Sequence, residues 1–168
     1  MEVVFYIAAM VAITSTVLAI TRLNAVHALL YLIVSLLSVA VVFYVIGAPF
    51  IAALEVIIYA GAIMVLFVFV VMMLNLGKAA TDRERQWQRP GMWVGPSLLA
   101  AILIAEMAYL IAGPGTAAYG SAVIGPKQVG IVLFGPYLIG VELASMLLLG
   151  ALVGAYHLGR RIPEKTEN

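Results

Sequence analysis

A long apolar segment in the middle of the chain, from Ala52 to Leu76, places the strongest constraint on the fold. It contains about 25 residues, and a helix needs about 20 mainly apolar residues to cross the hydrocarbon core of a bilayer. Lipid offers no hydrogen bonds to the backbone, so a single segment of this kind crosses it as a helix. We therefore predict a transmembrane helix here.

Four further apolar segments accompany it. The chain has 168 residues, of which 65% are hydrophobic and 10% charged, whereas a soluble domain carries about 25% charged residues. The sequence predicts an all-α protein, an integral membrane bundle of five transmembrane helices in a single domain covering residues 1–168. We expect these helices at about 3–20, 28–46, 52–76, 92–112 and 136–157.

The connecting segments predict an orientation in the membrane. Between the expected helices lie a hydrophilic loop at 77–91, a loop rich in glycine and proline at 113–135, and a polar tail at 158–168. A short surface helix is expected near 128–134. Eight basic residues fall on one side of a five-helix arrangement: Arg22, Lys78, Arg83, Arg85, Arg89, Arg160, Arg161 and Lys165. Lys127 alone falls on the other. By the positive-inside rule, loop 77–91 and the carboxyl terminus are cytoplasmic, and loop 113–135 and the amino terminus are periplasmic.

Charge and composition argue against several functions. A net charge of +1 with no basic stripe argues against a nucleic-acid partner. The chain has no cysteine, so it has no thiolate metal site or thiol nucleophile. We find no nucleophile constellation, phosphate-binding loop or metal cluster, and we interpret His27 and His157 as residues of the membrane interface. The sequence therefore predicts no active site and no metal or cofactor site in this chain alone.

The third predicted helix carries three residues that lipid anchoring does not require. They are Glu55, Tyr59 one turn later, and Gly61 between two alanines. At about 100° per residue, Glu55 and Tyr59 share one helix face, which we expect to face protein. Two interpretations of Glu55 remain open: a structural acid hydrogen-bonded to a neighbouring helix, or a group on a water path. Gly61 is compatible with close helix packing or with a kink or π-bulge.

Glu106 and Glu142 are the other acids expected within helices, each near the outer end of its helix. A hydroxyl lies three residues after each, on Tyr109 and on Ser145, within reach of a local contact. The predicted helices contain no lysine or arginine to pair with these acids. The acids are then either held uncharged or offered to a partner subunit. Small residues on the last helix, including the GxxxG pair of Gly150 and Gly154, favour a partner.

Several long motifs resemble one known family. The stretch EVIIYAGAIMVLFVFVVMMLNL (55–76) resembles the signature of the J-subunit family of the proton-pumping NADH-quinone oxidoreductase, respiratory complex I, equivalent to the mitochondrial subunit 6 family. Further matches are NAVHALLYLIVSLL (24–37), RERQWQRP (83–90) with WVGP (93–96) behind it, and VGIVLFGPYLIGVELASMLLLGALVGAYHLGR (129–160). The resemblance covers nearly the whole chain.

The resemblance implies a noncatalytic membrane-arm subunit of the bacterial inner membrane. Its implied neighbours are the quinone-chamber subunit, the small three-helix subunits and the antiporter-like subunits. The implied complex uses NADH, FMN, iron–sulfur clusters and quinone, none of them bound by this chain. The resemblance also implies a π-bulge near Tyr59 to Val65 that converts to a regular helix and so makes or breaks a proton path. Glu55, Tyr59, Gly61 and Val65 are the gating residues that follow, and Glu106 and Glu142 are candidate buried acids.

Two other functions stay open at this point. Some membrane chains of multisubunit sodium/proton antiporters are related to this family, so the chain fits a subunit of such an antiporter. A purely structural scaffold subunit fits as well. It predicts that Glu55→Gln and Gly61→Val leave pumping intact when assembly is normal.

Overall fold

The computed structural model describes residues 2–74, 91–112 and 123–159. Within these ranges the chain has five helices long and apolar enough to cross a membrane, which confirms the predicted fold class. They are Glu2–Thr21, Ala25–Val45, Pro49–Met73, Trp93–Ala112 and Leu138–Gly159. Their ends lie within three residues of the predicted ones. Nearly all of loop 77–91, residues 113–122 of loop 113–135 and nearly all of tail 158–168 lie outside the described residues.

The chain forms two compact units, Met1–Gly125 and Pro126–Asn168, which we describe separately. The single domain and the orientation of the termini stay predictions.

In the first unit, α1 (Glu2–Thr21) packs against α2 (Ala25–Val45) through one narrow face. The buried residues of α1 recur every three or four positions, as they do on one side of a helix: Val4, Ala8, Val11 and Ser15. Small side chains bring the two backbones close enough for hydroxyls to bond across them. Ser38 donates to the Ala8 carbonyl at 2.6 Å, and the Thr16 and Ser35 hydroxyls lie 2.7 Å apart.

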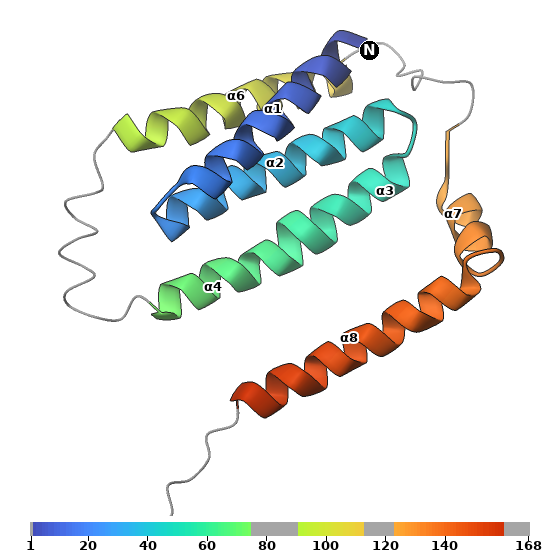
Figure 1. Cartoon of the computed structure of the whole chain (residues 1–168). Helices are drawn as coiled ribbons and strands as arrows, with labels where there is room; N and C mark the ends of the chain where they lie inside the picture. The colour runs from blue at the N-terminus through green and yellow to red at the C-terminus, as the bar shows by residue number, and fades with distance from the viewer. Residues whose placement is uncertain (1, 75–90, 113–122, 160–168) are drawn as a thin grey trace, which may run out of the picture. The chain divides into compact units, whose positions relative to one another are not determined.

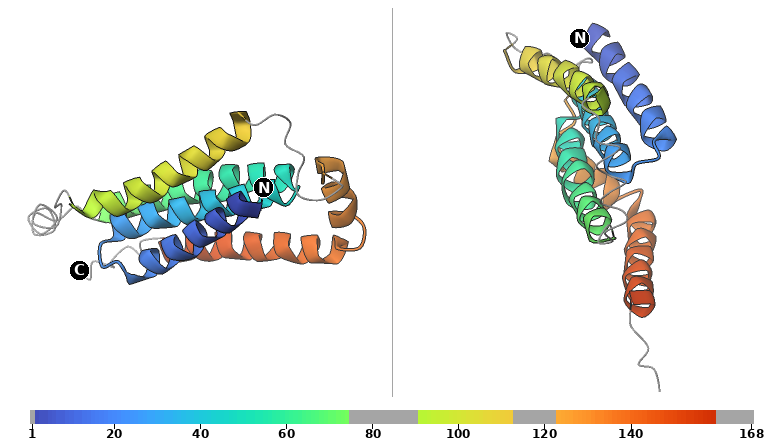
Figure 2. Two further views of the ribbon diagram at one scale, coloured as in Figure 1. Left: turned by 90° about the horizontal axis from the view of Figure 1, so that it is seen from above. Right: turned by 90° about the vertical axis from the view of Figure 1, so that its left-hand side faces the viewer.

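Helix α2 is the central element of the first unit. It contacts α1, every part of the third span, and α6 (Gly91–Ala112), and Figures 1 and 2 show it between α1 and the third span. Six buried residues of α1, α2 and α6 form the core cluster: Val4, Ala8, Val41, Val45, Leu103 and Leu110. Asn24 caps the start of α2, since its side chain accepts hydrogen bonds from the N–H groups of Val26 and His27.

A three-residue turn joins α2 to the third span. Gly47 has a φ of 92°, a left-handed conformation that glycine adopts without a Cβ penalty. The next helix begins at Pro49, where proline is favoured because its missing N–H would have no partner in the first turn. The Gly47 carbonyl accepts a hydrogen bond from the Ile124 N–H at 2.8 Å. This bond ties the segment after α6 to the turn.

The second unit contains α7 (Pro126–Leu133) and α8 (Leu138–Gly159). α7 corresponds to the short helix expected near 128–134. Neither helix has a buried residue. A Cβ added at Gly140, Gly150 or Gly154 would meet no atom within 4 Å. The small-residue face of α8 is therefore uncovered within its own unit.

Candidate functional site

The third span is not a uniform α-helix. It consists of α3 (Pro49–Leu54), the π-helix η1 (Glu55–Ile63) and α4 (Met64–Leu74), which follow one another without interruption between the labels α3 and α4 in Figure 1. At its end the Met64 N–H bonds to the Tyr59 carbonyl, five residues back, and to the Gly61 carbonyl. A π-helix carries one more residue per hydrogen-bonded turn than an α-helix and is frequent at functional sites.

The predicted π-bulge is confirmed, although its bounds differ from those expected. The resemblance places it near Tyr59 to Val65, whereas the π-helix begins four residues earlier and ends at Ile63. Val65 belongs to the regular helix α4 and is 66% exposed. The shift has a physical reason: each donor in a π-helix bonds five residues back, so the segment extends from the glycine toward Glu55.

Gly61 has little room for a side chain in this backbone. A Cβ built on it would lie 3.0 Å from the carbonyl oxygen of Val56, five residues earlier. Few real Cβ atoms come this close to another atom, and here the neighbour is backbone, which cannot rotate away. Glycine also destabilises an ordinary helix by about 1 kcal/mol relative to alanine. Both effects favour the π-helix at this position.

The polar residues of the segment do not pair with each other. Glu55 is half-buried and Tyr59 is 49% exposed, and no hydrogen bond joins the carboxyl to the phenol. No residue of η1 is buried. Neither polar group therefore has a hydrogen-bond partner among the described residues.

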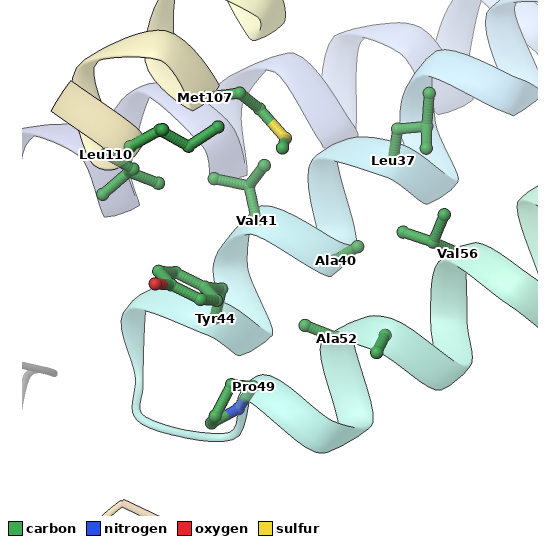
Figure 3. Close-up of a pocket in the computed structure, with 11 residues that line it drawn as sticks. Leu37, Ala40, Val41, Tyr44, Pro49, Ala52, Val56, Met107 and Leu110 are labelled. Carbon is green, nitrogen blue, oxygen red and sulfur yellow. The ribbon is translucent and has the colours of Figure 1, made fainter. Parts of the chain in front are cut away.

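An apolar cavity of about 320 Å³ adjoins the beginning of the π-helix. Figure 3 shows Ala52 and Val56 of the third span on one side, Met107 and Leu110 of α6 on the other, and α2 residues between them. Tyr44 supplies the one hydroxyl among the lining side chains. The space is partly open to the outside of the chain, and it leaves room for side chains to shift beside η1.

The two other acids lie in different surroundings. Glu106 is 7% exposed, and neither carboxyl oxygen has a hydrogen-bond partner in the described structure. Tyr109, expected to reach it, is 66% exposed. Glu142 is exposed on α8, and the Ser145 hydroxyl donates to the Glu142 backbone carbonyl at 2.7 Å instead of contacting its carboxyl. A backbone carbonyl one turn back is the closer acceptor for a serine in a helix.

Contacts between α2 and α6 went unpredicted from the sequence. His27 is 3% exposed, its ring lies 5.7 Å from that of Trp93, and neither ring nitrogen has a partner in the described structure. The Tyr31 hydroxyl lies directly against Gly95, where it would collide with a Cβ. Arg22 lies 5.3 Å from the centre of the Tyr31 ring. The sequence gives little indication of these contacts. The motif WVGP (93–96) indicates where a helix begins, but it does not indicate which residues of other helices that helix contacts.

Comparison with known proteins assigns the chain to a family. The family model for NADH-ubiquinone/plastoquinone oxidoreductase chain 6 matches residues 15–158. The chain belongs to this family. It is similar to NADH-quinone oxidoreductase subunit J of Pseudomonas aeruginosa, at 60% identity over 162 residues, which cover 96% of this chain and 98% of the relative.

Other subunit J relatives of the chain 6 family give the same result. The Escherichia coli K12 protein is 56% identical over 160 residues, 95% of this chain and 87% of the relative. That of Buchnera aphidicola subsp. Schizaphis graminum is 52% identical over 160 residues, 95% and 98% of the two chains. The π-helix therefore lies in a chain 6 family protein with five helices of membrane-spanning length among the residues described.

Proposed function

We propose that this chain is a noncatalytic membrane-arm subunit of a proton-pumping NADH:quinone oxidoreductase, and that its third span gates proton transfer. The observation that carries the proposal is the π-helix Glu55–Ile63 inside a membrane-spanning helix of a chain 6 family member. A π-helix is less stable than a regular helix and is kept where the surroundings favour it. Such a segment suits a switch between two backbone arrangements.

The proposed switch is a change of hydrogen-bond register. When the Met64 N–H exchanges the Tyr59 carbonyl for the Ala60 carbonyl, the helix on one side of the segment turns by about one residue, or 100°, and moves about 1.5 Å. The turn carries the polar pair Glu55 and Tyr59, or the bulky side chains after Met64, into or out of a water path. Quinone chemistry elsewhere in the complex supplies the bias between the two states.

The cavity supports this arrangement energetically. Forcing extra side-chain volume into a well-packed core costs about 1–3 kcal/mol. Beside η1 the lining side chains Ala52 and Ala53 are small, and about 320 Å³ is open. The third span can therefore turn against α2 with little repacking.

The proposal extends to location, partners and cofactors. The chain is a multi-pass protein of the bacterial inner membrane, with the amino terminus periplasmic and the carboxyl terminus cytoplasmic. Its partners are the quinone-chamber subunit, the small three-helix subunits and the antiporter-like subunits. NADH, FMN, iron–sulfur clusters and quinone bind to other subunits of the complex.

The gating proposal is tested by structures of the assembled complex, one with a quinone-site inhibitor bound and one during turnover. We expect the Met64 N–H to bond to Tyr59 in one state and to Ala60 in the other. The same acceptor in every state contradicts gating. Co-purification with flavin and iron–sulfur subunits tests the assembly separately, and isolation with antiporter chains alone contradicts it.

A further inference from the structure

One face of α6 carries an acid among apolar core residues. The buried residues of this helix recur at helical spacing, at Pro96, Leu103, Glu106 and Leu110. Leu103 and Leu110 belong to the core cluster with Val4, Ala8, Val41 and Val45 of α1 and α2. Glu106 lies between these two leucines on the same face, so its carboxyl points into the α1–α2–α6 core.

The carboxyl of Glu106 has no partner there. Both oxygens are closed off from solvent, and neither makes a hydrogen bond in the described structure. Glu106 is also absent from the lining of the cavity, although the neighbouring Met107 belongs to it. The site is therefore separate from this cavity.

Among the groups that titrate, Tyr44 of α2 lies at the Glu106 end of the helices, where it lines the cavity with Met107 and Leu110 and is 37% exposed. The buried faces of α1 and α2 carry two more, His27 and Tyr31, and both lie at the other end. His27 packs on Trp93 and Tyr31 lies on Gly95, which is 11 residues from Glu106 and so about 17 Å along the helix. Arg22 lies over the Tyr31 ring at that same end. No cation described in this unit is therefore close enough to pair with a Glu106 carboxylate.

We propose that Glu106 is a proton-binding site in the core of the first unit, a carboxylic acid that keeps its proton at neutral pH. An ionised carboxylate with neither a cation nor a hydrogen-bond donor is strongly disfavoured away from water. Adding a proton removes the charge and supplies an O–H donor. The site is distinct from the third span and does not depend on the register switch there.

Infrared spectroscopy on the assembled complex with ¹³C-labelled glutamate tests the proposal. The C=O stretch of a protonated glutamic acid shifts with the label, and we expect Glu106→Gln to lose one such band. In the wild type that band is present at neutral pH. Ala105→Ser, at an exposed position of α6 next to Glu106, is the matched control and keeps the band. Loss of a carboxylate band, or no change, in Glu106→Gln overturns the proposal.

A second variant keeps the test decisive if the glutamine variant does not assemble. Glu106→Leu replaces the acid with an apolar side chain of similar size in the stripe between Leu103 and Leu110. A neutral, unpartnered acid predicts normal assembly and a melting temperature at or above that of the wild type. A lower melting temperature or failed assembly shows that the carboxyl makes a stabilising contact in the core, and overturns the proposal of an unpartnered acid.

Discussion

At Gly61 a single hydrogen atom occupies the place where every other residue would bring a carbon against the Val56 carbonyl. The 3.0 Å approach penalises any side chain in the π-helix, while replacing glycine favours the regular helix by about 1 kcal/mol. Both effects favour the regular helix over the π-helix when glycine is replaced. A substitution here therefore shifts the balance between the two registers by a factor of at least about five.

The first prediction is a graded loss of function in the order Gly61→Ala, Gly61→Val, Gly61→Leu. Quinone-linked turnover and proton transfer fall together, by about fivefold or more in Gly61→Leu, because the π register is lost. Turnover is measured on fully assembled enzyme and proton transfer on vesicles, with Ala62→Val as the control for added bulk next door. A fully assembled Gly61→Leu enzyme with normal rate and normal coupling contradicts gating.

The second prediction concerns Glu55, which is half-buried and has no hydrogen-bond partner in the described structure. If its function is to bind water or a neighbour as an uncharged group, Glu55→Gln retains much of the turnover and Glu55→Ala loses several-fold more. The amide keeps the shape and hydrogen bonding that alanine lacks. The measurement is turnover and proton transfer in both variants at equal assembly. Equal losses in both variants point to ionisation as the requirement.

The third prediction rests on the contact between Gly95 and Tyr31. Gly95→Ala brings a Cβ into the Tyr31 hydroxyl, and Tyr31 is only 2% exposed, so it cannot swing away. Overpacking of this kind costs about 1–3 kcal/mol, and we expect lower thermal stability of the subunit within the complex. Adding Tyr31→Phe removes the colliding oxygen and restores part of the loss. Gly130→Ala, where the Cβ would meet nothing within 4 Å, is the control. Equal effects at the two glycines contradict the assignment.

At the scale of the element, the third span differs from the other four because its backbone changes type within one continuous helix. Residues Glu55–Ile63 are π-helical, and α3 and α4 on either side are α-helical. Hydropathy and length predict that a helix is present, but they do not distinguish one backbone register from another. The π-bulge was therefore predicted from the resemblance alone, and its bounds could be determined only from the hydrogen bonds in the structure.

The fourth prediction is that deletion of Ala62 converts the third span into a regular α-helix. A π-helical turn holds one extra residue, so removing one lets the N–H groups after the deletion bond four residues back. We expect an assembled complex in which turnover and proton transfer are lost to a similar degree as in Gly61→Leu. The register is read from a structure of the variant. A regular helix with full activity shows that the wide turn is dispensable.

The sequence predicts the spans of the protein but not the contacts of its polar side chains. Five spans could be predicted because apolar runs of this length have one structural solution in lipid. The partners of polar side chains could not, since they depend on tertiary packing. His27, expected at the interface, is buried against Trp93, and Glu106 lacks the Tyr109 contact that helical spacing permits. In both cases helix packing decides the direction of the side chain.

At the scale of the whole molecule, the fifth prediction tests the orientation inferred from eight basic residues against one. The chain has no cysteine, so a thiol reagent labels this chain only at a cysteine introduced by substitution. Leu23→Cys lies in the exposed connection between α1 and α2, and Lys127→Cys lies on α7. In intact cells a membrane-impermeant maleimide is expected to label Lys127→Cys and to reach Leu23→Cys only after permeabilisation. The reverse pattern inverts the topology.

The turn at Gly47 has a consequence for how the protein is made. Only residues 46–48 connect α2 to the third span, and the turn's backbone is further held by Ile124. A connection of three residues is too short to let one helix cross the bilayer while the other stays outside it. We therefore expect the two helices to enter the bilayer together as a hairpin, with α2 packed against the third span.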